Sequence, residues 1–379
     1  MVSNNSDKIF SQDARSIYDE IHDVHKIRSS TNESISSEAR NRKKRLLLLA
    51  TGGTIASGQG KDGLEPEYTI DDILKITVTQ ADYYDLDARD ILSLDSSNIQ
   101  PEEWQIIARA IDENASMYDG IVVTHGTDTM AYTASIISFM LQGLKIPVVF
   151  TGSQIPITEA LTDAHLNLAS ALAMAASSVP GVFLAFGGMI ILGTRAVKTH
   201  TSRFRAFDSI NREPFAVIDS VGINFNQNEL NYLKERNSDR DYLARFDLCP
   251  DVFLLKLIPG MKPEILDYLI EAGYRGLVIE AFGIGGIHSL HRDLLKALER
   301  VLAKGIPVIV TSQCLYEKSD FSLYATGRKL LEAGAIEAFD MTTEAAVTKL
   351  IWCLGQGMDM FECRRVFNLD LVGEISRKI

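Results

Sequence analysis

Two threonines lie in glycine-containing turns that directly follow short apolar segments. Thr54 follows the segment 46–50 and the pair Gly52-Gly53, and Thr127 follows the segment 120–124 and the pair His125-Gly126. An apolar run that ends in glycine and small hydroxyl residues is typical of a buried parallel strand that enters a tight turn. In open α/β sheets, ligands bind at such turns. The two turns therefore predict one shared pocket, in which a hydroxyl could attack a carbonyl group.

The neighbours of these threonines favour a hydrolase. A threonine hydroxyl is a weak nucleophile and needs a base or a proton relay. Asp128 stands beside Thr127, and Lys198 follows the strand-like segment 182–186 and two glycines. A lysine buried near a threonine can have its pKa lowered enough to accept a proton, and turn amides can hold an oxyanion. Spacing alone also allows Lys198 to be a solvated loop residue and His125 to be a buried residue at a strand end.

Other site chemistries match the sequence poorly. The glycines at 52 and 53 are adjacent with no third glycine at a helix start, so the turn departs from the dinucleotide-binding pattern, and no P-loop sequence occurs. We find no nucleophile elbow around a serine and no partner pattern among the histidines. Zinc-binding spacings of histidines and acids are also missing from the sequence. The sequence predicts neither a metal nor a cofactor, because hydroxyls and turn amides suffice for the hydrolase.

Composition and charge narrow the class of protein. The chain has 379 residues, 46% hydrophobic and 23% charged, which is typical of a soluble globular protein. Its net charge of −12 argues against a nucleic-acid partner, and no apolar stretch reaches the roughly 20 residues that span a bilayer. The first residues lack the pattern of a secretion signal. We expect a cytoplasmic protein with reduced cysteines, which are Cys249, Cys314, Cys353 and Cys363.

Strand-like and helix-like segments alternate from residue 45 onward, which predicts βαβ units and parallel sheets. We expect an α/β protein with a larger N-terminal parallel-sheet domain at 45–213, a linker in the polar stretch 214–251, and a smaller flavodoxin-like C-terminal α/β domain at 252–379. The expected strands are 46–50, 121–124, 148–151, 182–186, 252–258, 276–281 and 307–311. The expected helices are 101–115, 130–141, 163–176, 263–272, 290–303, 323–333 and 343–355.

Residues 1–44 form a polar N-terminal extension. Apolar residues recur at helical spacing between Ala14 and Val24, which predicts one amphipathic helix. We expect this helix to dock on the domain or on a neighbouring subunit. The basic run 40–45 is interpreted as a solvated lead-in to the first strand, with a targeting role or an anionic partner as the alternative.

The two threonine turns resemble the signature motifs of the asparaginase/glutaminase family, and the similarity extends over about residues 45–379. The resemblance implies that Thr54 is the nucleophile, that Thr127 is the second threonine of the site and that Asp128 holds the substrate. Lys198, in Val-Lys-Thr, matches the catalytic lysine. Tyr68 falls where the family carries a tyrosine on a flexible lid, hydrogen-bonded to the first threonine.

The resemblance also assigns the substrate contacts. Ser96 matches the serine that contacts the α-carboxylate of the substrate, and Gly53 and Ser97 are expected beside it. The segments 279–287 and 368–374 resemble cytosolic members of the family. Secreted members carry a glutamine where this chain has Ser97, so the groups that complete the α-amino site stay open, a neighbouring subunit among them.

The family implies hydrolysis of free L-asparagine through an acyl-enzyme, by a homodimer or homotetramer. The charge and the lack of a long apolar stretch predict that the protein binds neither nucleic acid nor membrane. One alternative is the ammonia-supplying subunit of an archaeal-type tRNA-dependent amidotransferase. That subunit has an extra folded domain in front, whereas this extension is short and lacks strand patterns. A second alternative is a non-catalytic amino-acid sensor, which the retention of both threonines, the lysine and the tyrosine disfavours.

Overall fold

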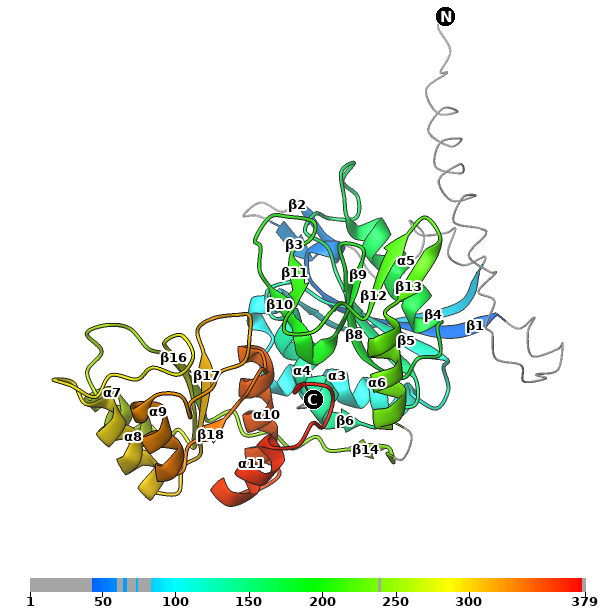
Figure 1. Ribbon diagram of the computed structural model, residues 1–379. Helices are drawn as coiled ribbons and strands as arrows, with labels where there is room; N and C mark the ends of the chain where they lie inside the picture. The colour runs from blue at the N-terminus through cyan, green and yellow to red at the C-terminus, as the bar shows by residue number, and fades with distance from the viewer. Residues whose placement is uncertain (1–42, 60–63, 67–72, 74–82, 238–239, 377–379) are drawn as a thin grey trace, which may run out of the picture.

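The structure is a computed structural model, which describes residues 43–59, 64–66, 73, 83–237 and 240–376. Two α/β units of different size lie side by side (Figure 1). The larger is built around an eight-stranded sheet and the smaller around a four-stranded parallel sheet, which confirms the predicted α/β class. The amphipathic helix expected between Ala14 and Val24 lies outside the described residues.

The large sheet is mostly parallel. Its strand order is β13-β12-β9-β8-β7-β5-β1-β4. The strands β4, β1, β5, β7 and β8 pair in parallel, whereas β9, β12 and β13 pair with their neighbours in antiparallel fashion. The bounds are β1 Lys44–Gly52, β4 Tyr84–Leu94, β5 Gly120–Thr124, β7 Pro147–Thr151, β8 Gly181–Phe186, β9 Met189–Leu192, β12 Ala216–Asp219 and β13 Gly222–Phe225.

Helices cover both faces of this sheet, which is why its central strands are apolar along their whole length. In β1, Leu47 and Leu49 pack into the core beneath α3 (Pro101–Asn114) and α4 (Met130–Met140). Leu46 and Leu48 point to the opposite face, into the core beneath α5 (Ala164–Ala175). The alternation follows from the two-residue period of a strand. The order strand, turn, helix then places each turn at the carboxyl end of its strand.

The stretch 214–251 differs from the irregular linker expected there. It contains β12 and β13, which extend the large sheet, then helix α6 (Gln227–Asn237) and the short strand β14 (Leu243–Ala244), which pairs with β6 (Leu141–Gln142). These elements lie at the sheet edge and on the surface. Their exposed faces carry the polar residues that made the segment look like a loop.

The smaller unit holds β15 (Val252–Lys256), β16 (Gly276–Ala281), β17 (Val308–Ser312) and β18 (Ile336–Glu337), in that order across the sheet. The strands of this sheet follow one another in chain order. In a flavodoxin-like sheet the first two strands stand in the reverse order, 2-1-3-4-5, so the small sheet differs from that type in this respect. Helix α8 begins at Leu294 rather than Leu290, because the side chain of Asp293 caps it by accepting from the amide of Lys296. The helices are α7 Glu264–Glu271, α8 Leu294–Ala303, α9 Ala325–Ala333, α10 Thr343–Gly355 and α11 Met360–Phe367.

Helix α10 joins the two units by packing against α4 (Figure 1). One continuous apolar core contains Ile137 of α4 together with Leu350 of α10. Within this junction Lys349 and Glu374 form an ion pair with an Nζ–Oε1 distance of 2.5 Å, and both side chains are 0% exposed. The C-terminal segment thus lies between the units. No helix among the described residues is long and apolar enough to cross a membrane.

Candidate active site

The two threonine turns are in direct backbone contact. Thr54 begins the short 3-10 helix η2 (Thr54–Ala56) after β1, and Thr127 lies in the turn after β5. A Cβ atom placed on Gly53 would lie 2.5 Å from Cα of Gly126, closer than real Cβ contacts allow. Gly53 also has a φ of 83°, which favours glycine. Thr54 and Thr127 each follow one of the two glycines in contact, so the structure brings the two threonines into one site.

Ser96 lies against Gly126, next to the contact between the two threonine turns. It starts the 3-10 helix η4 (Ser96–Asn98) after β4, and a Cβ atom on Gly126 would lie 2.6 Å from its Oγ. The Ser96 hydroxyl is buried and accepts from the amide of Asp128 at 3.2 Å. Its own hydrogen has no acceptor among the described residues and can bind a carboxylate. Ser97 is exposed, and its amide and hydroxyl both donate to Asp95 Oδ1, at 2.8 and 2.5 Å.

Lys198 points into the site rather than into solvent. It is the last residue of β10 (Ala196–Lys198), which forms a two-stranded hairpin with β11 (Phe207–Ser209). Its Nζ donates to Thr127 Oγ1 at 2.7 Å and to Asp128 Oδ1 at 2.6 Å. The side chain of Lys198 is 19% exposed and that of Asp128 is 63% exposed. This geometry excludes the solvated-loop interpretation of Lys198.

His125 is a buried structural residue. Its Nδ1 donates to the carbonyl of Gly126 at 2.7 Å, and its Nε2 accepts from the hydroxyl of Thr133 at 3.0 Å. The indole of Trp104 donates in turn to that hydroxyl at 3.0 Å. Burial lowers the pKa of His125 to about 4, so the ring is neutral at physiological pH. With both nitrogens engaged, His125 orients the Gly126–Thr127 peptide instead of acting as a base.

Gln154 is a site residue that the sequence analysis missed. Its Oε1 lies 3.5 Å from Thr127 Oγ1, and its Nε2 donates to the carbonyls of Thr201 and Arg203 at 3.2 and 3.3 Å. It lies in the turn after β7, the strand next to β5. A third apolar strand that ends in glycine, here Gly152, is the signal that could have identified this turn.

Two other expectations, the lid with Tyr68 and the lack of a metal site, can be compared only with the described residues. Tyr68 lies outside them. Of the lid that was expected around it, the structure describes a small hairpin, β2 (Ser57–Gln59) with β3 (Leu64–Pro66). No group of three or more histidines, cysteines or acids is arranged to hold a metal ion in the part of the chain that the structure describes.

Parallel strands that end in threonine, serine and glycine turns, with a lysine brought to them by a separate hairpin, define a two-domain α/β enzyme of the amidohydrolase class. The chain belongs to the asparaginase/glutaminase family. Residues 45–231 match the family model of the N-terminal domain of asparaginase, and residues 251–367 match that of the glutaminase/asparaginase C-terminal domain.

Known proteins of this family cover most of the chain. It is 43% identical to an L-asparaginase from Thermococcus kodakarensis, over 88% of this chain and 99% of that protein. The solved structure of the thermostable enzyme from this organism superposes with a TM-score of 0.82 at 42% identity, covering 88% of this chain and all of that chain. A glutamyl-tRNA(Gln) amidotransferase component from Methanosphaera stadtmanae is 35% identical over 90% of this chain and 79% of that protein. A probable cytoplasmic L-asparaginase from Campylobacter jejuni has a TM-score of 0.72 at 27% identity, over 86% of this chain and 99% of that chain.

Proposed function

We propose that the protein hydrolyses the side-chain amide of free L-asparagine, giving L-aspartate and ammonia. One observation carries the proposal: Lys198 Nζ meets both Thr127 Oγ1 and Asp128 Oδ1 directly beside the contact between the two threonine turns. A nucleophilic hydroxyl, a second hydroxyl with a lysine and a carboxylate for the substrate are then in one place. The 43% identity to an L-asparaginase supports the same reaction.

In the first half of the proposed reaction, Thr54 Oγ1 attacks the amide carbon of the substrate. The threonine proton passes through Tyr68 to the amide nitrogen, the carbon–nitrogen bond breaks, and ammonia leaves. An ester between Thr54 and the aspartyl group remains. Backbone amides of the turns stabilise the oxyanion that forms on the carbonyl oxygen.

In the second half, water attacks the ester and Thr54 recovers its proton. Thr127 and Lys198 activate this water, since Lys198 Nζ lies 2.7 Å from Thr127 Oγ1. The same pair can also share the proton transfer of the first half, with Asp128 Oδ1 holding Lys198 Nζ in place. The expected product is an aspartate whose new carboxylate oxygen comes from water.

The substrate is expected to bind by its amino-acid head. The free hydrogen of the Ser96 hydroxyl can donate to the α-carboxylate, while the exposed carboxylate of Asp128 can accept from the α-ammonium group. Gly53 lies in the turn before Thr54, and Ser97 is exposed beside Ser96. The distance from this anchor to Thr54 decides which side-chain length places the amide for attack. We expect asparagine to be preferred over glutamine, although one methylene discriminates by only about 1–3 kcal/mol.

Ammonia release by the purified chain alone tests the proposal. Asparagine and glutamine are assayed in parallel at one pH, and a higher kcat/KM for asparagine is the expected result. A chain that needs a partner protein to release ammonia would be an amidotransferase component. Binding of asparagine in calorimetry without ammonia release would identify a sensor. Equal or reversed specificity constants would overturn the asparagine assignment.

The protein is also proposed to form a homo-oligomer, a dimer or a tetramer. Exposed apolar side chains gather on two neighbouring loops, which follow β16 and β17 at one edge of the small sheet. These loops are bonded to each other, since the amide of Asp320 donates to the carbonyl of Ile284 at 2.9 Å. Such a patch is typical of an interface. Its members are Ile284, Leu290, Leu315, Tyr316, Leu323 and Tyr324.

The oligomer is tested by light scattering of the wild type and of a Leu290→Glu, Leu323→Glu variant. We expect the variant to be smaller than the wild type. A cytoplasmic location is proposed as well, supported by four free cysteines and by the likeness to the cytoplasmic enzyme of Campylobacter jejuni. Fractionation of the source cells, with the protein followed by antibody, tests this location.

A further inference from the structure

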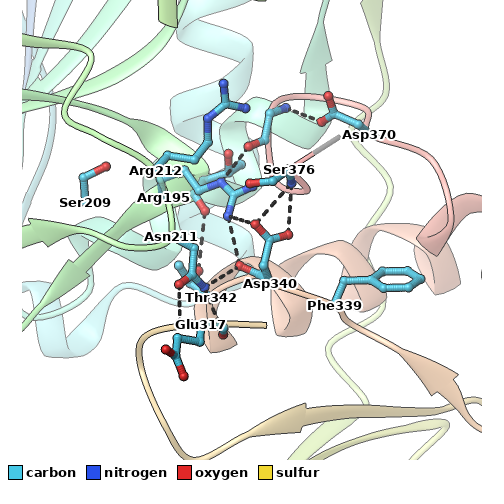
Figure 2. Close-up of polar contacts among 12 residues, drawn as sticks. Arg195, Ser209, Asn211, Arg212, Glu317, Phe339, Asp340, Thr342, Asp370 and Ser376 are labelled. Carbon is cyan, nitrogen blue, oxygen red and sulfur yellow. Dashed lines mark hydrogen bonds and ion pairs between the residues drawn. The ribbon is translucent and has the colours of Figure 1, made fainter. Parts of the chain in front are cut away.

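The hairpin that carries Lys198 is attached to the C-terminal unit at both of its ends. Arg195 immediately precedes β10, and Asn211 follows β11 by two residues. The amide of Ile210 donates to the carbonyl of Arg195 at 2.9 Å, so the two ends of the hairpin lie together. Figure 2 shows Arg195 and Asn211 converging from this side on Asp340, which lies in the C-terminal unit after β18.

The first end is held by a buried guanidinium. Arg195 is 0% exposed, and its Nη1 donates to the carbonyl of Asp340 at 2.9 Å and to its Oδ2 at 3.1 Å. Nε donates to the carbonyl of Gly373 at 2.8 Å, and Nη2 to the hydroxyl of Ser376 at 3.4 Å. The Ser376 amide donates back to Asp340 Oδ1 at 3.0 Å. A rigid fork of this kind fixes the backbone that bears it.

The second end is held by an amide side chain. Asn211 Nδ2 donates to the carbonyl of Asp340 at 3.0 Å, and Asn211 Oδ1 accepts from the amide of Glu317 at 2.6 Å. Five non-glycine residues have positive φ among those described, and three of them meet here: Asn211 at 59°, Glu317 at 74° and Phe339 at 57°. Such backbone conformations persist only where the surroundings enforce them, and they gather at functional sites.

The other site residues are positioned by different elements. Ser96 and Asp128 follow β4 and β5 of the large sheet, whereas β10 and β11 form a separate two-stranded sheet. The hairpin packs on the large sheet through Phe207, whose ring meets that of Phe186 in β8. Its two ends have a second attachment, the bonds of Arg195 and Asn211 to Asp340, which the large sheet does not provide. Asp340 is bonded to both ends of the hairpin, whereas the other partners in this region each hold one end.

We infer that Arg195 and Asn211 are positioning residues, which place Lys198 for catalysis by anchoring its hairpin to Asp340 of the C-terminal unit. The inference rests on the proposed function, in which Lys198 takes part in proton transfer while Ser96 and Asp128 hold the substrate. Loosening the hairpin should then slow the chemical step more than it weakens substrate binding. A misplacement of about 1 Å can cost up to about 100-fold in rate.

Asn211→Gly is the most informative variant, because glycine accepts the positive φ and only the side-chain hydrogen bonds to Asp340 and Glu317 are lost. Its matched control is Ser178→Gly, which replaces another residue of positive φ (61°) whose hydroxyl accepts from Lys44 within the larger unit at 3.0 Å. We expect kcat of Asn211→Gly to fall roughly tenfold with KM changed less than about twofold. The control should keep both constants. Unchanged kcat in Asn211→Gly, or a change confined to KM, would overturn the inference.

Asp340→Asn probes the same anchor from the opposite unit, and it weakens the bond to Arg195 while keeping the shape of the side chain. Hydrogen exchange followed by mass spectrometry gives a readout that needs no activity. Faster exchange over residues 196–199 is expected in Asn211→Gly and Asp340→Asn, with exchange in β1 and β5 unchanged. If the wild type releases no ammonia, the proposed function fails. The hydrogen-exchange result then still shows whether Asn211 and Asp340 hold the hairpin in place. Exchange equal to that of Ser178→Gly would contradict the positioning role.

Discussion

Gly53 and Gly126 touch through their backbones, and no side chain fits between them. Each glycine directly precedes one of the two threonines, so this contact sets the separation of the two hydroxyl groups. A Cβ atom on Gly53 would lie 2.5 Å from both Cα and N of Gly126. The glycines are therefore required by the close approach of two turns from β1 and β5, which are neighbouring strands of the large sheet.

Gly53→Ala is expected to abolish turnover and to destabilise the protein. Gly260→Ala is the matched control, since Gly260 has a similar φ of 91° but no atom within 4 Å of an added Cβ. Both variants carry the strain of a positive φ, and only the first adds the clash. The clash should cost about 1–3 kcal/mol beyond the control in urea unfolding. Equal unfolding free energies and retained activity in Gly53→Ala would contradict the close contact.

Thr54→Ala and Thr127→Ala should each lower kcat by several orders of magnitude and leave the melting temperature near that of the wild type. The replacements remove a nucleophile or its activating partner, not a packed group. Ser138→Ala serves as a control, because this buried hydroxyl donates only within its own helix, to Ala134 at 2.7 Å. A threonine variant that kept near-normal activity would have been assigned the wrong role.

Lys198→Met should eliminate activity, and Lys198→Arg should fail to restore it. The guanidinium stays protonated at every accessible pH, and its planar head cannot reproduce the compact group that lies 2.7 Å from Thr127 and 2.6 Å from Asp128. Steady-state ammonia release measures both variants. Restored turnover in the arginine variant would show that position 198 supplies charge alone.

Much of this site could be predicted from the sequence because its signals are local. The apolar runs before Thr54 and Thr127 lie within the buried strands β1 and β5, and the glycines mark the turns where the backbones meet. The resemblance to the family supplied Ser96 and Lys198, and the structure brings both beside Thr127 and Asp128. Spacing alone left Lys198 undecided, since its approach depends on a hairpin far from the turns in sequence.

Other features had no local signal. Strand β4 carries Asp85, Asp87, Arg89 and Asp90, a composition that hides a strand at the edge of a sheet, where one side faces solvent. The anchoring of Arg195 and Asn211 on Asp340 joins residues more than a hundred positions apart. Such long-range contacts arise from packing of the two units, which the period of apolar residues cannot specify.

The neutral His125 should make stability depend on pH. Burial lowers its pKa from 6.5 to about 4, so between these values the unfolded chain binds more protons than the folded one. Stability should therefore rise with pH over this window, by up to about 1.4 kcal/mol per pH unit. His125→Gln should lose this contribution. Glu344, whose pKa burial raises to about 7, acts in the opposite direction, so the wild-type minus variant difference is the quantity to measure. A difference independent of pH between 4 and 6.5 would contradict the buried neutral ring.

Removing one partner of the buried pair Lys349 and Glu374 should lower the free energy of unfolding more than removing both. Lys349→Met leaves a carboxylate with 0% exposure without its counter-ion, which typically costs about 3–5 kcal/mol. The double variant Lys349→Met, Glu374→Gln should regain much of this loss, because no charge remains buried. Urea unfolding at neutral pH measures both, and additive losses in the double variant would contradict the coupling.

The same pair predicts that the free energy of unfolding falls as the pH is lowered from 4.5 toward 2. Burial acts to raise the pKa of Glu374, but the charge of Lys349 and hydrogen bonds from Lys349 and from the amides of Leu371 and Val372 lower it to about 2. A depressed carboxyl pKa stabilises the folded state above the unfolded value of 4.5, and this stability is lost as the pH falls toward 2. The wild type should therefore lose stability more steeply than the double variant between pH 4.5 and 2. Parallel curves over that range would show that Glu374 is not held as a buried carboxylate.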